Sequence, residues 1–102
     1  MNFDELSENI LEWASNKNLI RKENINAQAL KMVEEVGETC GAILKNDHPE
    51  IQDGIGDILV TVIILSAQLG YDPEECLELA WNVIKDRKGK TVDGTFIKED
   101  QL

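Results

Sequence analysis

Basic residues are scarce in this chain: Lys and Arg number 10 against 20 Asp and Glu, which gives a formal net charge of −10 at pH 7. Binding to nucleic acid or to an anionic membrane depends on clustered cations that neutralise phosphates. We therefore expect neither nucleic acid nor a membrane as a partner. Aromatic residues are also few, at 5%, so the 42% apolar residues predict one aliphatic core and a single domain over residues 1–102.

Cysteine and long apolar runs are rare as well. Cys40 and Cys76 fall at apolar positions of helical patterns, which favours buried, reduced thiols over a disulfide. The apolar run of residues 58–65 is too short to span a bilayer. The first residues lack the basic segment that begins a signal peptide. These features together predict a cytoplasmic protein.

Helix signals divide most of the chain into four segments, at about residues 3–16, 26–45, 49–69 and 73–88. The third is apolar on all sides in its second half, which predicts a place at the centre of a bundle. After the fourth, residues 90–98 contain two short extended pieces around Asp93-Gly94, a pair typical of a hairpin turn. We therefore expect an all-α fold, a four-helix bundle with a short C-terminal hairpin or arm.

Five carboxylates gather on the second and third of these helices. They are Glu34, Glu35, Glu38, Asp53 and Asp57. Spacings of three and four residues direct them along one side of each helix, and the short connection between the helices allows the two sets to meet. Asp57 shares its stripe with Val60 and Ile64, so it is carried toward a buried face, where a carboxylate needs a partner. Converging acids suggest Mg²⁺, with Mn²⁺ as a possible substitute.

A plainer interpretation of the acids stays open beside the metal site. The carboxylates can form a solvated acidic face, with Lys31 and Lys45 as surface partners. This alternative fits the first set better than it fits Asp57, because an unpaired carboxylate beside aliphatic side chains is strongly disfavoured.

Several motifs resemble those of the MazG-like nucleotide pyrophosphohydrolases of bacteria and phages. They are Glu34-Glu35-x-x-Glu38, an acidic pair before an apolar helix, and Lys85-Asp86-Arg87-Lys88-Gly89-Lys90 followed by Val92-Asp93-Gly94-Thr95-Phe96. The similarity covers roughly residues 24–98. It implies an all-α fold assembled as a dimer or a dimer of dimers. It also implies Mg²⁺-dependent hydrolysis of nucleoside triphosphates to monophosphate and pyrophosphate.

The resemblance also implies roles for the acids. Glu34, Glu35, Glu38 and Asp57 match the family's metal-binding positions, and Glu35 and Glu38 are the candidate catalytic carboxylates, with Glu35 as the general base. Many members carry Glu three residues before the final Asp, where this chain has Gly54. Asp53 is the nearest substitute but has a shorter reach, so the number of metal ions stays open. Close helix packing is the preferred interpretation of Gly54 and Gly56.

Substrate contacts are implied in the same way. Lys85, Arg87, Lys88 and Lys90 would hold β- and γ-phosphate oxygens, although cations are also favoured at a helix C-terminus by the helix dipole. The candidates for binding the base are Trp13, Trp81 and Asn82, the tryptophans by stacking and the amide by a hydrogen bond. Core packing is nevertheless the preferred interpretation for both tryptophans, because both also fit apolar helix faces.

Three functions compete for this sequence. The favoured one is a Mg²⁺-dependent nucleotide pyrophosphohydrolase that acts as a homodimer or homotetramer. The alternative is a non-catalytic helical module that binds a partner protein and keeps the acids for a structural cation. An acidic mimic of nucleic acid ranks last, because its acids would be spread over an exposed face.

Overall fold

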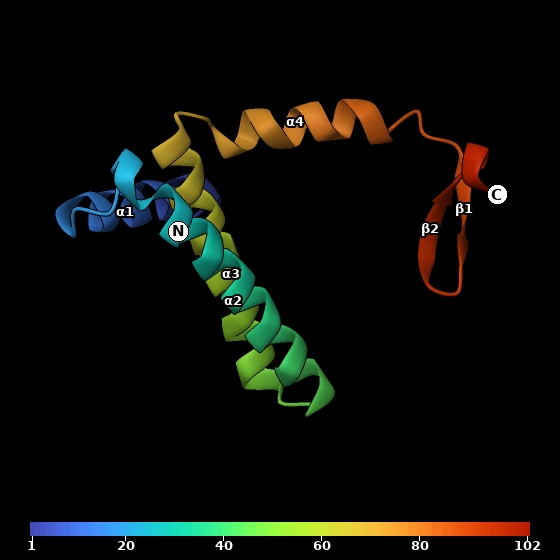
Figure 1. Cartoon of the computed structure of the whole chain (residues 1–102), viewed down its shortest axis with the longest axis horizontal. Coiled ribbons are helices and arrows are strands. Elements are labelled where there is room, and N and C mark those ends of the chain that lie inside the picture. The colour runs from blue at the N-terminus through green and yellow to red at the C-terminus, as the bar shows by residue number, and fades with distance from the viewer.

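The computed structural model describes residues 1–102 and contains four helices and one hairpin (Figure 1). The helices are α1 (Phe3–Asn16), α2 (Ile25–Leu44), α3 (His48–Leu69) and α4 (Pro73–Ile84), and the strands are β1 (Gly89–Val92) and β2 (Thr95–Lys98). Short 3₁₀ turns occupy Lys22–Asn24 and Glu99–Gln101. The mostly helical architecture agrees with the all-α class that the sequence predicts. Helices α1 to α3 begin and end within one residue of their predicted limits.

Local chemistry explains where the helices begin and end. The Asn2 side chain accepts a hydrogen bond from the Glu5 backbone N–H at 2.9 Å, and Asp72 accepts one from Glu74 at the same distance. These caps satisfy backbone donors that the first helical turn leaves free. At the other end of α3, Gly70 has φ 81 and closes the helix in the left-handed conformation that glycine adopts without strain.

Helix α4 ends at Ile84, before the predicted limit near residue 88. The Arg87 N–H bonds the Ile84 carbonyl in a turn, and Glu99 N–H bonds the Lys88 carbonyl at 2.9 Å. The carbonyl of Lys88 is thus paired with the residue after β2, so the backbone leaves the helical conformation before residue 88. In the hairpin itself, Asp93 (φ 50) and Gly94 (φ 82) both have positive φ, as a two-residue type I′ turn requires.

Helices α1, α2 and α3 form the core of the chain. Helices α2 and α3 run antiparallel, and α1 packs across α3 (Figure 1). Helix α3 also meets α4 and thus contacts each of the other helices, which agrees with its predicted central place. The buried apolar residues are Ala14, Ala42, Ile63 and Ile64, a small aliphatic core.

Helix α4 does not join this core, so the predicted four-helix bundle does not form within one chain. It turns 102° away from α3 and carries the hairpin at its far end (Figure 1). We call residues 73–98 the arm. Its apolar side chains, among them Leu77, Leu79 and Trp81, are more than half exposed, because no other helix of the chain covers them. Helix α4 therefore lacks the packing of an apolar side that stabilises most helices of this length.

Other burial predictions are also wrong for the single chain. Cys40 and Cys76 are both free and exposed rather than buried. Trp13 is 53% exposed and Trp81 56% exposed, so neither packs in the core. No single helix has the length and apolar composition to cross a membrane; α3 and α4 meet that test only as a bent pair.

Candidate functional site

The five predicted carboxylates lie on α2 and α3, and we call them the acid cluster. Its members are Glu34, Glu35, Glu38, Asp53 and Asp57. Glu35 is the buried member, with 8% of its surface exposed, and Asp57 is half-buried. The other three are exposed. The partial burial of Asp57 beside Val60 agrees with its position on the stripe that faces the core.

Electrostatics show that the acids of the two helices influence one another. The pKa of Glu38 is raised, chiefly by the negative charge of Glu35 and next by desolvation and by Glu34. The pKa of Asp57 is raised chiefly by burial and next by the charges of Asp53 and Glu35. Because Glu35 acts on carboxylates of both helices, the two sets lie within electrostatic reach. The cluster carries more negative charge than the protein compensates.

One cation of the chain partly compensates this charge. Lys31 Nζ lies 3.2 Å from Glu35 Oε1 and 3.4 Å from Glu34 Oε1. These contacts raise the pKa of Lys31, first through the hydrogen bond to Glu35 and then through the one to Glu34. The pairing of Lys31 with the acids is the one that the solvated-face interpretation predicts, whereas Lys45 forms no ion pair.

The donor set fits a hard divalent cation in its chemistry. Mg²⁺ and Mn²⁺ prefer carboxylate oxygens, and the cluster offers five carboxylates with two raised pKa values. The side chains are nevertheless not gathered as a ready-made cage, because no group of three or more Asp, Glu, His or Cys residues has an arrangement that could hold a metal ion. Side-chain rotation would be needed to bring the oxygens together, and for the exposed Glu34 and Glu38 such rotation is inexpensive.

Helices α2 and α3 approach closely beside the cluster. A Cβ on Gly54 would overlap Thr39 Oγ1 and press on the rest of that side chain. Thr39 Oγ1 in turn donates a hydrogen bond to the Glu35 carbonyl at 2.8 Å. The packing interpretation of Gly54 is therefore confirmed. The same interpretation is wrong for Gly56, where an added Cβ would meet nothing within 4 Å.

A hollow of about 390 Å³ opens next to the cluster, and we call it the Trp13 hollow. Its lining residues are Trp13, Leu19, Gln28, Lys31, Glu35, Asp57, Val60, Thr61 and Ile64. Three helices and the loop after α1 therefore contribute to it. Apolar and aromatic side chains make up part of the wall, and Lys31, Glu35 and Asp57 make up another part. A nucleoside with its phosphates needs both kinds of surface.

Two glutamines support the hollow and were missed in the sequence. Gln28 Nε2 donates to the Thr61 carbonyl at 3.3 Å and joins α2 to α3. Gln68 Nε2 donates to the Leu19 carbonyl at 2.8 Å and holds the loop against α3. Helical spacing could have predicted that both glutamines lie on the same helix sides as the acids. Gln28 lies seven residues before Glu35, and Gln68 lies on the stripe of α3 that contains Asp57.

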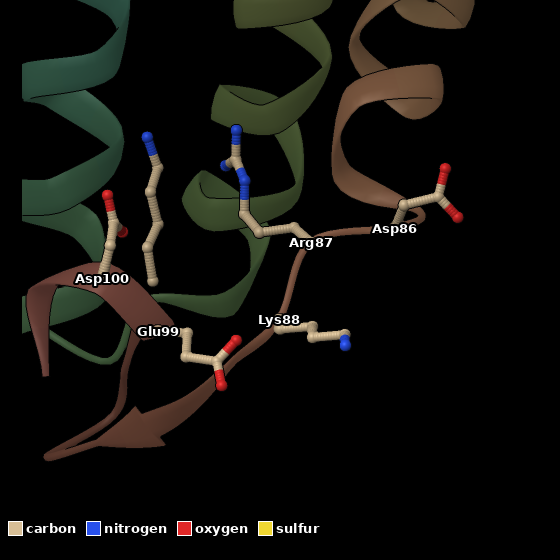
Figure 2. Close-up of a pocket in the computed structure, with 6 residues that line it drawn as sticks. Asp86, Arg87, Lys88, Glu99 and Asp100 are labelled. Carbon is tan, nitrogen blue, oxygen red and sulfur yellow. The ribbon is translucent and has the colours of Figure 1, made fainter.

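The basic residues of the arm do not meet the acid cluster within one chain. Lys85, Arg87 and Lys88 lie between α4 and the hairpin, and Lys90 lies in β1, so all four belong to the part of the arm beyond α4 (Figure 1). Figure 2 shows Arg87 and Lys88 at a hollow of about 450 Å³, with their side chains extending in different directions. Its six lining residues are Asp86, Arg87, Lys88, Lys98, Glu99 and Asp100, so acids and bases balance there. Trp81 and Asn82 lie on α4 as well, away from Trp13.

Comparison with known families identifies a matching domain over most of the chain. The family model for the MazG nucleotide pyrophosphohydrolase domain matches residues 23–92. The chain belongs to this family. The match spans α2, α3, α4 and β1, and it therefore includes the whole acid cluster and the basic residues of the arm. Helix α1 with Trp13 lies outside the matched residues.

A similar protein is known from a bacteriophage. An uncharacterised 18.2 kDa protein of the rep-hol intergenic region of Haemophilus phage HP1 (strain HP1c1) is 38% identical over 68 residues. The aligned residues cover 67% of this chain and 42% of the phage protein, so the chain spans less than half the length of that relative. No solved structure matches the chain.

Proposed function

We propose that the protein is a Mg²⁺-dependent nucleoside triphosphate pyrophosphohydrolase, which converts a ribo- or deoxynucleoside triphosphate and water to the monophosphate and pyrophosphate. The family supports a nucleotide pyrophosphohydrolase in general. The observation that carries the specific reaction is the position of Glu35 and Asp57, which belong both to the acid cluster and to the wall of the Trp13 hollow. A nucleotide in that hollow would have its phosphates beside the carboxylates.

The acid cluster would hold the divalent cation. Bound Mg²⁺, or Mn²⁺ in its place, would neutralise phosphate charge and lower the pKa of a water molecule. Glu34, Glu35, Glu38, Asp53 and Asp57 are the residues proposed to hold it, with oxygen donors of the type that Mg²⁺ prefers. Gly54 offers no ligand, so Asp53 would supply the second oxygen donor on α3 next to Asp57.

Two carboxylates are suited to the proton transfer that accompanies water attack. Glu35 is buried beside the hollow, where a general base would reach water close to the α-phosphorus. Glu38, three residues after Glu35 on the same helix, is the second candidate for this role. Attack at the α-phosphorus forms a bond to the water oxygen and breaks the bond to the departing pyrophosphate, and one of these carboxylates takes the proton.

Trp13 would bind the base. Its indole is half exposed and forms part of the hollow, so a stacking surface is available without unfolding the core. A base against Trp13 would set the sugar and the α-phosphate toward Glu35 and Asp57.

The protein would act as a homodimer or homotetramer. Lys85, Arg87, Lys88 and Lys90 lie on the arm, away from the acids of their own chain, and the apolar side of α4 is uncovered. Packing of the arm on a second copy would cover that side and bring the basic residues, with Trp81 and Asn82, toward the partner's nucleotide. Cations there would hold β- and γ-phosphate oxygens, which the acids alone would repel.

A non-catalytic helical module is the second candidate, favoured by one observation. Lys31 already pairs with Glu34 and Glu35, and no ready-made cage for a metal ion exists. In such a module the acids would keep a structural cation or none, and the exposed side of α4 would bind another protein.

Product analysis separates these two functions. Ribo- and deoxynucleoside triphosphates are incubated with the protein and Mg²⁺, Mn²⁺ or excess chelator, and products are separated by ion-exchange chromatography. Monophosphate and pyrophosphate in equal amounts, formed only with metal, are the expected result. Absence of turnover on every nucleotide, with folded protein and metal present, would overturn the enzyme and favour the binding module.

A further inference from the structure

Lys31 contacts the acid cluster and also lines the Trp13 hollow. It lies on α2, one turn before Glu34 and Glu35, and its ammonium group contacts both carboxylates. The same side chain lines the Trp13 hollow. Lys31 is therefore the cation of the chain that both contacts the acids and lines the hollow proposed to hold the base.

The contacts of Lys31 are of a kind that exchanges readily. Its side chain is 51% exposed and that of Glu34 is 56% exposed, and ion pairs open to water are weak because water screens them. The pair with Glu35 is open to water on the lysine side, since the Glu35 side chain is 11% exposed. The ammonium group is a compact charge on a flexible stem, so it can change partners without moving the helix. A divalent cation that binds Glu34 and Glu35 competes directly with this ammonium group, because both need the same carboxylate oxygens.

We propose that Lys31 is an exchangeable counter-ion, which neutralises Glu34 and Glu35 before the divalent cation binds and then contacts the α-phosphate of the nucleotide. This inference rests on the proposed function. With the base against Trp13 and the phosphates directed to the acids, the α-phosphate would be the phosphate nearest the base, and Lys31 lines the hollow that would hold it. Its ammonium group stays protonated and stabilises the negative charge on the non-bridging α-phosphate oxygens during water attack.

The test compares Lys31→Met with Lys45→Met. Lys45 lies on the exposed C-terminal end of α2 and has no ion pair, so its replacement makes the same charge change without touching the proposed contacts. Mn²⁺ binding is measured by calorimetry without nucleotide, on protein whose helical content is checked by circular dichroism. Loss of the competing ammonium should tighten Mn²⁺ binding about two- to tenfold in Lys31→Met, and by less than about twofold in Lys45→Met.

Nucleotide binding and turnover test the second half of the proposal. A nucleotide analogue with a methylene group between the α- and β-phosphates resists hydrolysis, and its affinity in the presence of Mn²⁺ should fall in Lys31→Met. The rate constant kcat should fall about 100-fold, the usual effect of losing one group that stabilises transition-state charge. Lys31→Arg keeps the charge and should recover part of both.

Each outcome decides the inference. Mn²⁺ affinity that is unchanged or weaker in Lys31→Met overturns the counter-ion role. Normal analogue affinity and normal kcat in that variant overturn the contact with the α-phosphate, provided the wild-type protein is active. If the wild-type protein hydrolyses no nucleotide, the proposed function fails by itself, and the Mn²⁺ measurement still decides whether Lys31 competes with the metal.

Discussion

Thr39 on α2 fills the space that a side chain at Gly54 of α3 would need. The two residues therefore interlock the helices that carry the acid cluster. Thr39 is itself fixed by its hydrogen bond to the Glu35 carbonyl, one turn earlier on α2. On α3, Asp57 lies almost one turn after Gly54. Gly54 thus lies at a close helix contact, where a longer side chain would force α2 and α3 apart.

Gly54→Ala should destabilise the fold by about 1–3 kcal/mol, because the added methyl group overpacks the contact with Thr39. Urea unfolding followed by circular dichroism measures the change. Gly56→Ala is the matched control, since its Cβ meets no neighbour, and it should be neutral or stabilise the helix by up to about 1 kcal/mol. Thr39→Ala removes the overlapping hydroxyl group and should recover part of the loss in the double variant. Equal effects of the two alanine substitutions would contradict the interlock.

Glu38→Gln or Asp57→Asn should lower kcat by at least about 100-fold, because each removes a charged oxygen donor with little change in volume. Helical content should stay normal, since neither side chain is part of the apolar core. Pyrophosphate release at saturating Mg²⁺ measures the loss. Glu12→Gln on α1, an exposed acid outside the cluster, is the control and should keep wild-type turnover. A near-normal rate in either cluster variant would remove that residue from the site.

The stability of the metal-free protein should depend on the charge of the cluster. Folding raises the pKa values of Glu38 and Asp57, so the folded state binds their protons more tightly than the unfolded state does. Their contribution to the free energy of unfolding is therefore favourable at low pH and is lost as pH rises from the ordinary carboxyl pKa through the raised values. Thermal melts of wild type and Glu38→Gln, from pH 4 upward, isolate this effect from the other acids.

Mg²⁺ should reverse this trend, because a bound cation favours the ionised carboxylates. With chelator, wild type should lose stability relative to Glu38→Gln as pH rises, and with saturating Mg²⁺ it should regain it. If the stability difference between the two proteins were the same at all pH values, with and without metal, the charge of Glu38 would have no effect on folding stability.

Trp13→Ala should weaken nucleotide binding about 5- to 150-fold, the range that corresponds to a stacking contribution of about 1–3 kcal/mol. Mn²⁺ affinity measured without nucleotide should stay unchanged, because Trp13 is no metal ligand. Tyr71→Ala is the control, since Tyr71 is an exposed aromatic residue that does not line the Trp13 hollow. Trp13→Phe should lie between wild type and Trp13→Ala. Equal losses in the two alanine variants would exclude a stacking role for Trp13.

Mixed subunits test whether the arm serves the neighbouring copy. Asp57→Asn and the double variant Arg87→Ala/Lys88→Ala should each be inactive by themselves. When equal amounts are unfolded and refolded together, random pairing makes about half of the dimers mixed. Each mixed dimer would contain one intact site, which combines one chain's acids with the other chain's arm, so about a quarter of all sites would be intact. Turnover should therefore reappear to about that level. No recovery in verified mixed dimers would mean that acids and bases of a site come from one chain.

Sequence alone determined the local features of this protein. Caps, proline positions and apolar spacing predict α1 to α3, because backbone donors and helical periodicity act within a few residues. Spacings of three and four residues likewise predict that Glu34 and Glu38, or Asp53 and Asp57, share a helix side. The family resemblance rests on the same local motifs, and it is confirmed over residues 23–92.

Only the tertiary structure decided how these features meet. The Trp13 hollow joins residues from three helices and a loop, and the Lys31 contacts decide which cation the acids hold when no metal is bound. The direction of α4 leaves Trp81 and Cys76 exposed in one chain, and Cys40 on α2 is exposed as well, although their apolar positions predict burial. Apolar periodicity shows which side of a helix must pack against another element. It does not show how α2 and α3 cross or where the chain bends before α4, because both depend on contacts between residues far apart in the sequence.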